Sequence, residues 1–146
     1  MKILVVNGPN LNMIGKRDLK IYGSLTLNEI NRKLVKLAKS EGFVLDFFQS
    51  NSEGALIDFL QKEAGGARGI LLNPGALAHY GYSLRDALAD TKLPIVEVHL
   101  SDIRRRESFR KINVLKDVTI DTVIGKKGKS CLIGLGKLID HLKKEL

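Results

Sequence analysis

The chain has 146 residues, of which 44% are hydrophobic and 27% charged, a composition typical of a globular protein and unlike that of a disordered or fibrous chain. Its length predicts a single domain over residues 1–146. The lone cysteine, Cys131, excludes an intramolecular disulfide and a CxxC site, and the apolar run at residues 3–6 is too short for a secretion signal or a membrane span. These features favour a cytoplasmic protein without a membrane partner.

The net charge is +8 at pH 7. Such a charge is compatible with nucleic acid, an anionic membrane or an acidic small substrate as the partner. Only 5% of the residues are aromatic and none is Trp, so the stacking platforms of single-strand nucleic-acid binders are scarce. Much of the excess charge falls on predicted helix faces, where a solvated surface is the ordinary explanation.

The chain begins with a buried strand predicted over residues 2–6, followed by the polar loop Asn7-Gly8-Pro9-Asn10. Asparagine, glycine and proline favour turns, and α/β proteins bind ligands at the carboxyl ends of their parallel strands. A long loop then extends to residue 25 and contains Arg17 and Tyr22. Because loops longer than about 12–15 residues usually serve a function, and Gly15 and Gly23 flank these side chains, we predict a lid over a site.

Buried strands and amphipathic helices alternate over the rest of the chain. Thr26-Leu27-Asn28-Glu29 has the form of a capping box, in which Thr26 and Glu29 each accept a hydrogen bond from an otherwise unpaired backbone N–H. The helix that begins there is predicted to end at Gly42. Further strands are predicted over residues 44–49, 69–73, 95–100 and 122–124, and further helices over residues 53–64, 82–91 and around 132–142.

This alternation predicts an α/β fold, a flavodoxin-like three-layer sandwich with a five-stranded parallel sheet. Gly134 and Gly136 lie inside the last helix. Glycine in a helix costs about 1 kcal/mol relative to alanine, so we expect the packing of this helix to be weakened.

Polar side chains follow the predicted strands at one edge of the sheet, among them Asn73 and Ser101. Residues two apart in a strand face the same side, so Glu97 and His99 point together and the carboxylate can orient the imidazole for proton transfer. A purely structural pair at the sheet edge is the alternative. His79, in the loop after the third strand, is equally compatible with loop packing and with ligand contact.

Several other chemistries are not supported by the motifs. No cluster has metal-ligand spacing, and neither a G-x-S-x-G elbow nor a Cys/His pair is present, so the expected chemistry is proton transfer without a metal or cofactor. The segment Gly125-Lys126-Lys127-Gly128-Lys129-Ser130 resembles a phosphate-binding loop, but its glycines are too close together. The cluster Arg104-Arg105-Arg106, together with Arg110, lies beside the strand ends and favours a compact anionic substrate.

These residues together resemble the type II 3-dehydroquinate dehydratases in unbroken order from the N-terminus to about residue 110. The motifs that carry the resemblance are Asn7-Gly8-Pro9-Asn10-Leu11-Asn12, Gly15-Lys16-Arg17 with Tyr22-Gly23, Phe48-Gln49-Ser50-Asn51, Asn73-Pro74-Gly75-Ala76, Leu84-Arg85-Asp86-Ala87-Leu88 and Glu97-Val98-His99-Leu100-Ser101.

The resemblance implies reversible trans-dehydration of 3-dehydroquinate to 3-dehydroshikimate in the shikimate pathway, through an enolate and without a cofactor. It makes Tyr22 the base that removes a C2 proton. Free tyrosine has a pKa of about 10, so a nearby guanidinium must favour the phenolate, and Arg17 matches that role. Asn10 would hold a water against the enolate oxygen, and His99, oriented by Glu97, would protonate the departing C1 hydroxyl.

The resemblance also implies how the substrate is held. Its hydroxyls and carboxylate would contact Asn73, His79, Leu100, Ser101 and Arg110. Asp86 of a neighbouring subunit would complete the site, since family members resemble one another in forming trimers packed into dodecamers.

The chain departs from the family pattern at a few positions. Family members usually carry an aromatic residue in place of Leu77, Thr or Ser around Ala78 and Tyr80, and His in place of Ser52 and Arg104. None of these departures removes a proposed catalytic group.

The competing interpretation is a flavodoxin-like module that binds nucleotide or nucleic acid through a basic surface. It leaves the combination of Arg17, Tyr22, Glu97 and His99 unexplained.

Overall fold

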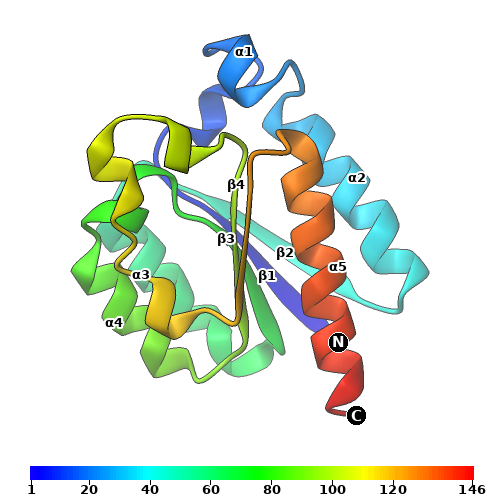
Figure 1. Cartoon of the computed structure of the whole chain (residues 1–146). Helices are drawn as coiled ribbons and strands as arrows, with labels where there is room; N and C mark the ends of the chain where they lie inside the picture. The colour runs from blue at the N-terminus through cyan, green and yellow to red at the C-terminus, as the bar shows by residue number, and fades with distance from the viewer.

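The computed structural model describes residues 1–146 and contains one sheet of five parallel strands in the order β2-β1-β3-β4-β5 (Figure 1). The strands are β1 (Lys2–Asn7), β2 (Val44–Gln49), β3 (Gly69–Asn73), β4 (Ile95–His99) and β5 (Asp121–Ile124). This order confirms the predicted flavodoxin-like α/β class, and its direction reverses between β1 and β3. Ligands of such sheets bind beyond the carboxyl ends of the strands at that reversal.

Helices cover both faces of the sheet (Figure 1). Helices α2 (Leu27–Ser40) and α5 (Gly128–Lys144) lie on one face, and α3 (Glu53–Glu63) and α4 (Tyr82–Thr91) on the other. Alternate side chains of β1 pack against the helices on opposite faces of the sheet. Ile3 and Val5 belong to the core under α2 and α5, while Leu4 and Val6 belong to the core under α3 and α4. A strand that is apolar on both sides needs such a double cover.

The predicted start and end of α2 are confirmed, with one difference in the cap. The Thr26 hydroxyl oxygen accepts a hydrogen bond from the Glu29 N–H at 3.2 Å, as expected. The Glu29 carboxylate accepts from the Thr26 hydroxyl at 3.1 Å, in place of the Thr26 backbone N–H that a full capping box uses. At the other end Gly42 has φ +82°, and the Phe43 N–H donates to the Ala38 carbonyl at 2.9 Å, which is a Schellman ending.

Helix α4 takes its N-terminal cap from another element. The residue that precedes it, Gly81, has no side chain to accept a hydrogen bond. Glu53 at the start of α3 supplies the acceptor, because its Oε2 accepts from the Leu84 N–H at 3.0 Å. The carboxylate therefore satisfies an otherwise unpaired backbone donor and fixes α4 against α3.

We predicted the segment between β1 and α2 as a long loop, but it contains secondary structure. It contains a 3-10 turn at Leu11–Met13 and the short helix α1 (Leu19–Tyr22), whose first turn is capped by the Asp18 side chain. A single turn held by one polar side chain has no apolar periodicity, which is why the sequence pattern did not reveal it. Tyr22 is the last residue of α1.

Gly134 lets α5 pack closely on the sheet. A Cβ atom at Gly134 would lie 2.4 Å from Val98 Cγ1 and 3.1 Å from Leu71 Cδ1, whereas no atom lies within 4 Å of one at Gly136. The expectation of a weakened helix is therefore wrong for Gly134, because its missing side chain is what permits the contact with β3 and β4.

The segment that resembles a phosphate-binding loop forms the turn between β5 and α5 and the first residues of α5. The Ser130 hydroxyl is fully buried and accepts a hydrogen bond from the Lys126 N–H at 2.9 Å. The Lys127 N–H donates to the Leu100 carbonyl, so this turn is bound to the end of β4. No helix of the structure combines the length and the apolarity that crossing a membrane requires.

Candidate active site

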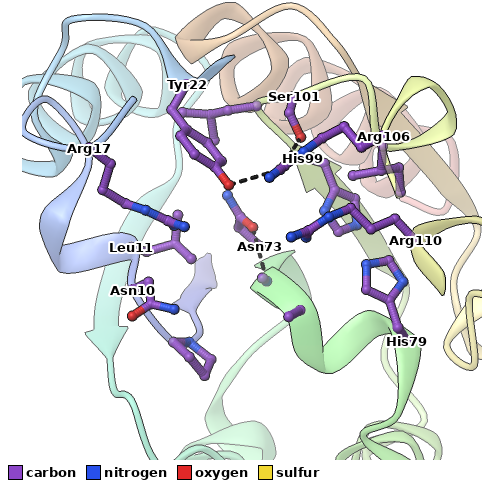
Figure 2. Close-up of a pocket in the computed structure, with 15 residues that line it drawn as sticks. Asn10, Leu11, Arg17, Tyr22, Asn73, His79, His99, Ser101, Arg106 and Arg110 are labelled. Atoms are coloured by element: carbon purple, nitrogen blue, oxygen red, sulfur yellow. Dashed lines mark hydrogen bonds between the residues drawn. The ribbon is translucent and has the colours of Figure 1, made fainter. Parts of the chain in front are cut away.

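A pocket lies beyond the carboxyl ends of β1, β3 and β4, at the reversal of the strand order (Figure 2). The loop after β1, helix α1, the turn after β3 and the segment after β4 all contribute to its wall. The predicted site residues that line it are Asn10, Arg17, Tyr22, Asn73, His79, His99, Leu100, Ser101 and Arg110. The pocket is therefore lined by residues that lie up to about a hundred positions apart in the sequence, from Pro9 to Arg110.

Two guanidinium groups contact Tyr22 in different ways. Arg106 Nη1 donates a hydrogen bond to the Tyr22 hydroxyl oxygen at 2.8 Å and a longer one to Ser101 Oγ at 3.3 Å (Figure 2). The Arg17 guanidinium carbon lies 4.3 Å from the centre of the Tyr22 ring, which is a cation–π contact. Arg17 is beside Tyr22 as expected, but the hydrogen-bond partner of the hydroxyl is Arg106.

The arginine cluster divides into outward and inward members. Arg104 and Arg105 are exposed and pair with Asp102, and the hydrogen bond from Arg104 lowers the pKa of the Asp102 carboxyl. Arg106 and Arg110 have side chains that are only 17% exposed and line the pocket. The sequence predicted a positive patch here, but it did not indicate which of the four arginines face the site.

His99 and Glu97 form the pair that the strand periodicity predicts. His99 Nε2 and Glu97 Oε2 are 2.5 Å apart, and the Glu97 residue is fully buried. Because Glu97 engages Nε2, Nδ1 is the ring nitrogen left for a ligand.

Asn113 is a member of this network that the sequence gave no reason to select. Its Nδ2 donates to both carboxylate oxygens of Glu97, at 3.1 Å each. Asn113 lies in an irregular segment beyond β4, where neither helical nor strand spacing applies.

His79 faces His99 across the pocket, with their ring centres 6.5 Å apart. His79 Nδ1 lies 2.6 Å from the Ile112 carbonyl oxygen, and this carbonyl can only accept, so Nδ1 carries the proton and donates. Burial lowers the pKa of His79 and the positive charge of Arg110 acts in the same direction, while the hydrogen bond to the Ile112 carbonyl and the nearby Glu97 oppose the shift. A neutral ring of this tautomer presents Nε2 as an acceptor.

Hydrogen bonds position three further lining residues, Asn10, Asn73 and Arg110. Asn10 has a left-handed backbone with φ +70°, and its N–H donates to Asn51 Oδ1 at 2.9 Å. Asn73 Oδ1 accepts from the Gly75 N–H at 3.2 Å, and Arg110 Nε donates to Glu107 Oε2 at 2.8 Å. The hydrogen bond from Arg110 lowers the pKa of the Glu107 carboxyl.

Asp86 is the predicted site residue that the structure does not bring to the pocket. It lies on α4 with a side chain that is 76% exposed, and it pairs with Arg85 Nη1 at 3.3 Å. Within one chain Asp86 therefore forms the local ion pair.

Fold and site together define an α/β protein with an anion-binding pocket equipped for acid–base chemistry. The positive groups Arg17, Arg106 and Arg110 favour an anionic ligand. Tyr22 and the Glu97-paired His99 are groups of the kind that exchange protons with a bound molecule. No group of three or more His, Cys, Asp or Glu side chains is placed to hold a metal ion.

The chain belongs to the dehydroquinase class II family, whose family model matches residues 1–139. A 3-dehydroquinate dehydratase of Geotalea daltonii is 49% identical over 144 residues, which cover 99% of this chain and all of the relative. Another, of Roseiflexus castenholzii, is 52% identical over 139 residues, covering 95% of this chain and 88% of the relative. The resemblance inferred from the motifs is thereby confirmed.

Solved structures agree with this assignment. The type II dehydroquinase of Butyrivibrio crossotus superposes with a TM-score of 0.91 at 40% identity, covering 94% of this chain and 97% of that one. The type II dehydroquinase of Propionibacterium acnes gives 0.90 at 32% identity, covering 95% and 96%.

Proposed function

We propose that this chain is a 3-dehydroquinate dehydratase that converts 3-dehydroquinate to 3-dehydroshikimate in the shikimate pathway. The observation that carries the proposal is the pocket itself. Tyr22, which two guanidinium groups contact, and His99, which pairs with Glu97, both line it. Relatives at 49% and 52% identity that bear this enzyme's name support the same activity.

Tyr22 acts as the base. Its oxygen takes a proton from C2 of the substrate, and the electron pair left on C2 moves into an enolate whose oxygen is the former C3 carbonyl. The positive charges of Arg106 and Arg17 favour the phenolate form that a base requires. Asn10, on the loop after β1, holds a water molecule against the developing enolate oxygen.

His99 acts as the acid that protonates the departing C1 hydroxyl. The enolate electrons return to form the C1–C2 double bond, the C1–O bond breaks, and His99 gives its Nδ1 proton to the oxygen so that water leaves. Glu97 accepts the Nε2 proton in a hydrogen bond throughout, which keeps the imidazole oriented and stabilises its protonated form. Neither step needs a cofactor.

The substrate carboxylate and hydroxyls are held by the rest of the pocket wall. Arg110 supplies positive charge, and Asn73 and Ser101 supply neutral hydrogen-bonding groups, as does the backbone of Leu100. His79 accepts from a substrate hydroxyl through Nε2. The net charge of +8 assists the approach of an anionic substrate.

We place the enzyme in the cytoplasm, as one domain over residues 1–146 that assembles into trimers and then a dodecamer. In that assembly Asp86 of one subunit reaches the pocket of the next. Its exposure on α4 leaves it free for such a contact.

A binding module with a basic surface is not favoured. Arg106 and Arg110 are the least exposed members of the arginine cluster and line the pocket, whereas a nucleic-acid stripe needs its cations on an open surface. Binding of that kind would also weaken steeply with salt through counterion release.

Turnover of 3-dehydroquinate, followed by the absorbance of the enone product, tests the proposal. Tyr22→Phe should lower kcat by at least about a hundredfold, since acid–base catalysis contributes roughly 10²- to 10⁴-fold, and should leave the fold unchanged. Tyr82→Phe is the matched control, because Tyr82 is 65% exposed and lies outside the pocket.

Absence of turnover by the unmodified protein would contradict the function. Activity of Tyr22→Phe above about a hundredth of the original would remove Tyr22 as the base. Loss of activity with EDTA that a divalent metal restores would contradict a mechanism without a cofactor.

A further inference from the structure

Glu97 is a fully buried carboxylate whose hydrogen bonds come from two partners. His99 Nε2 contacts Oε2 at 2.5 Å, and Asn113 Nδ2 contacts Oε1 and Oε2 at 3.1 Å each. A buried charge requires such donors, because the protein must replace the water that the carboxylate has lost. The orientation of Glu97 therefore depends on Asn113 as well as on His99.

The orientation of the Asn113 amide is itself determined by its contacts. Its Oδ1 accepts a hydrogen bond from the Leu115 N–H at 2.8 Å. The oxygen end of the amide is thereby assigned to the backbone, and the NH2 end faces Glu97. Only a donor at this position satisfies the carboxylate.

The segment that carries Asn113 also contacts the other histidine of the pocket, by a separate route. The Ile112 carbonyl lies 2.6 Å from His79 Nδ1, and the Val114 N–H donates to the Ala78 carbonyl at 2.8 Å. His79 is thus oriented by the backbone of this segment, while His99 is oriented through the side chain of Asn113 and Glu97.

We infer that Asn113 is a positioning residue, which holds Glu97 so that the His99 ring keeps its proton on Nε2 and presents Nδ1 to the substrate. The arrangement of Glu97 and His99 does not depend on the proposed reaction, whereas the kinetic consequence rests on the proposed function. Asn113 itself does not line the pocket and has no direct role at the substrate.

Asn113→Asp tests the inference with the least change of shape. The new carboxylate keeps an oxygen for the Leu115 N–H but places an acceptor, with a negative charge, against Glu97. We expect Glu97 to turn away from it, so that the proton on His99 Nε2 loses its acceptor and Nδ1 is no longer the nitrogen held toward the substrate. Nitrogen-15 NMR of the imidazole groups reports both tautomers directly, and His79 should keep its Nδ1–H form because its partner is a backbone carbonyl.

The kinetic expectation is a fall in kcat of about tenfold or more, a part of what acid–base catalysis contributes, with KM for 3-dehydroquinate within about twofold. The matched control is Asn28→Asp, which adds the same charge at an exposed position of α2 outside the pocket. Asn113→Ser, whose hydroxyl can still donate, should recover part of the lost kcat.

Two results would overturn the inference. One is a His99 ring whose nitrogen signals in Asn113→Asp match those of the unmodified protein. The other is a simultaneous change at His79 and His99 with a lowered unfolding temperature, which would make Asn113 a structural residue of the segment. If Asn113→Asp does not fold, the same NMR comparison is made on Asn113→Ala, which has no donor for Glu97, and an unchanged His99 in it together with unchanged kcat overturns the inference as well. The NMR readout needs no turnover, so failure of the proposed function would be recognised separately.

Discussion

At the scale of single residues, the two guanidinium groups at Tyr22 differ in what they contact. Arg106 donates to the hydroxyl oxygen at 2.8 Å, and Arg17 lies over the ring at 4.3 Å. A hydrogen bond to a charged group contributes roughly 1.5–3 kcal/mol, and a cation–π contact about 0.5–2 kcal/mol. Negative charge on a phenolate is concentrated on its oxygen, so the direct contact stabilises it more.

Arg106→Gln should therefore reduce kcat more than Arg17→Gln. The energies above correspond to losses of about 10- to 150-fold for Arg106→Gln and about 2- to 30-fold for Arg17→Gln. Steady-state kinetics on both variants measure the order, and Arg104→Gln, which is exposed, is the control. A larger loss in Arg17→Gln would show that the ring contact, and not the hydrogen bond, controls the tyrosine.

The buried His79 predicts how stability depends on pH. Burial lowers the pKa of His79 below its ordinary 6.5, so below about pH 6.5 the unfolded chain binds a proton that the folded protein resists. His79 therefore contributes stability above pH 6.5, and this contribution is lost as the pH falls toward the lowered value.

The measurement is the free energy of unfolding in urea at pH 7.5 and pH 5.5. The decrease between the two should be larger in the unmodified protein than in His79→Gln. The perturbed carboxyl groups Asp102, Glu107 and Asp121 all have pKa values lowered from 3.8–4.5, and do not titrate in this range. An equal decrease in both proteins would show that folding does not lower the pKa of His79.

At the scale of elements, α5 contains two glycines in opposite surroundings. Gly134 faces Val98 and Leu71 of the sheet, and Gly136 faces open space. The same substitution therefore has two opposing effects within one helix. Alanine favours the helix at either position, but only at Gly134 does its methyl group meet other atoms.

Gly136→Ala should raise the free energy of unfolding by up to about 1 kcal/mol. Gly134→Ala should lower it by about 1–3 kcal/mol, since an overpacked core must shift its backbone or side chains. Urea unfolding of the two variants measures the difference, each serving as the control for the other. Equal effects of the same sign would mean that α5 moves freely away from β4.

At the scale of the whole molecule, Asp86 is the one predicted substrate-binding residue that does not line the pocket of its own chain. That residue is exposed on α4 and pairs with Arg85. An exposed ion pair contributes little to stability, so loss of Asp86 should have little effect on folding. An effect on activity would then arise from contact with another subunit.

Mixing of subunits distinguishes the two roles of Asp86. Tyr22→Phe and Asp86→Ala oligomers should each be nearly inactive, and oligomers refolded from a mixture should regain activity, because some interfaces combine an intact Tyr22 with an intact Asp86. Native mass spectrometry verifies that mixed oligomers form. Mixed oligomers with no more activity than the separate variants would exclude a shared site.

The sequence by itself determined the fold and much of the site, because those features depend on local patterns. Apolar runs, the cap at Thr26 and the Gly42 ending depend on residues a few positions apart, and they located most strand and helix bounds within a residue or two. The pairing of Glu97 with His99 depends on strand spacing alone, and the structure confirms their contact. Roles within the site came from the family resemblance.

Only the tertiary structure decided which groups meet across long stretches of chain. The contact of Arg106 with Tyr22 joins residues 84 positions apart, and Asn113 reaches Glu97 from an irregular segment. The space around Gly134 depends on how closely α5 approaches β4. Such contacts are set by the packing of layers and by the paths of loops, and neither leaves a periodic signal in the sequence.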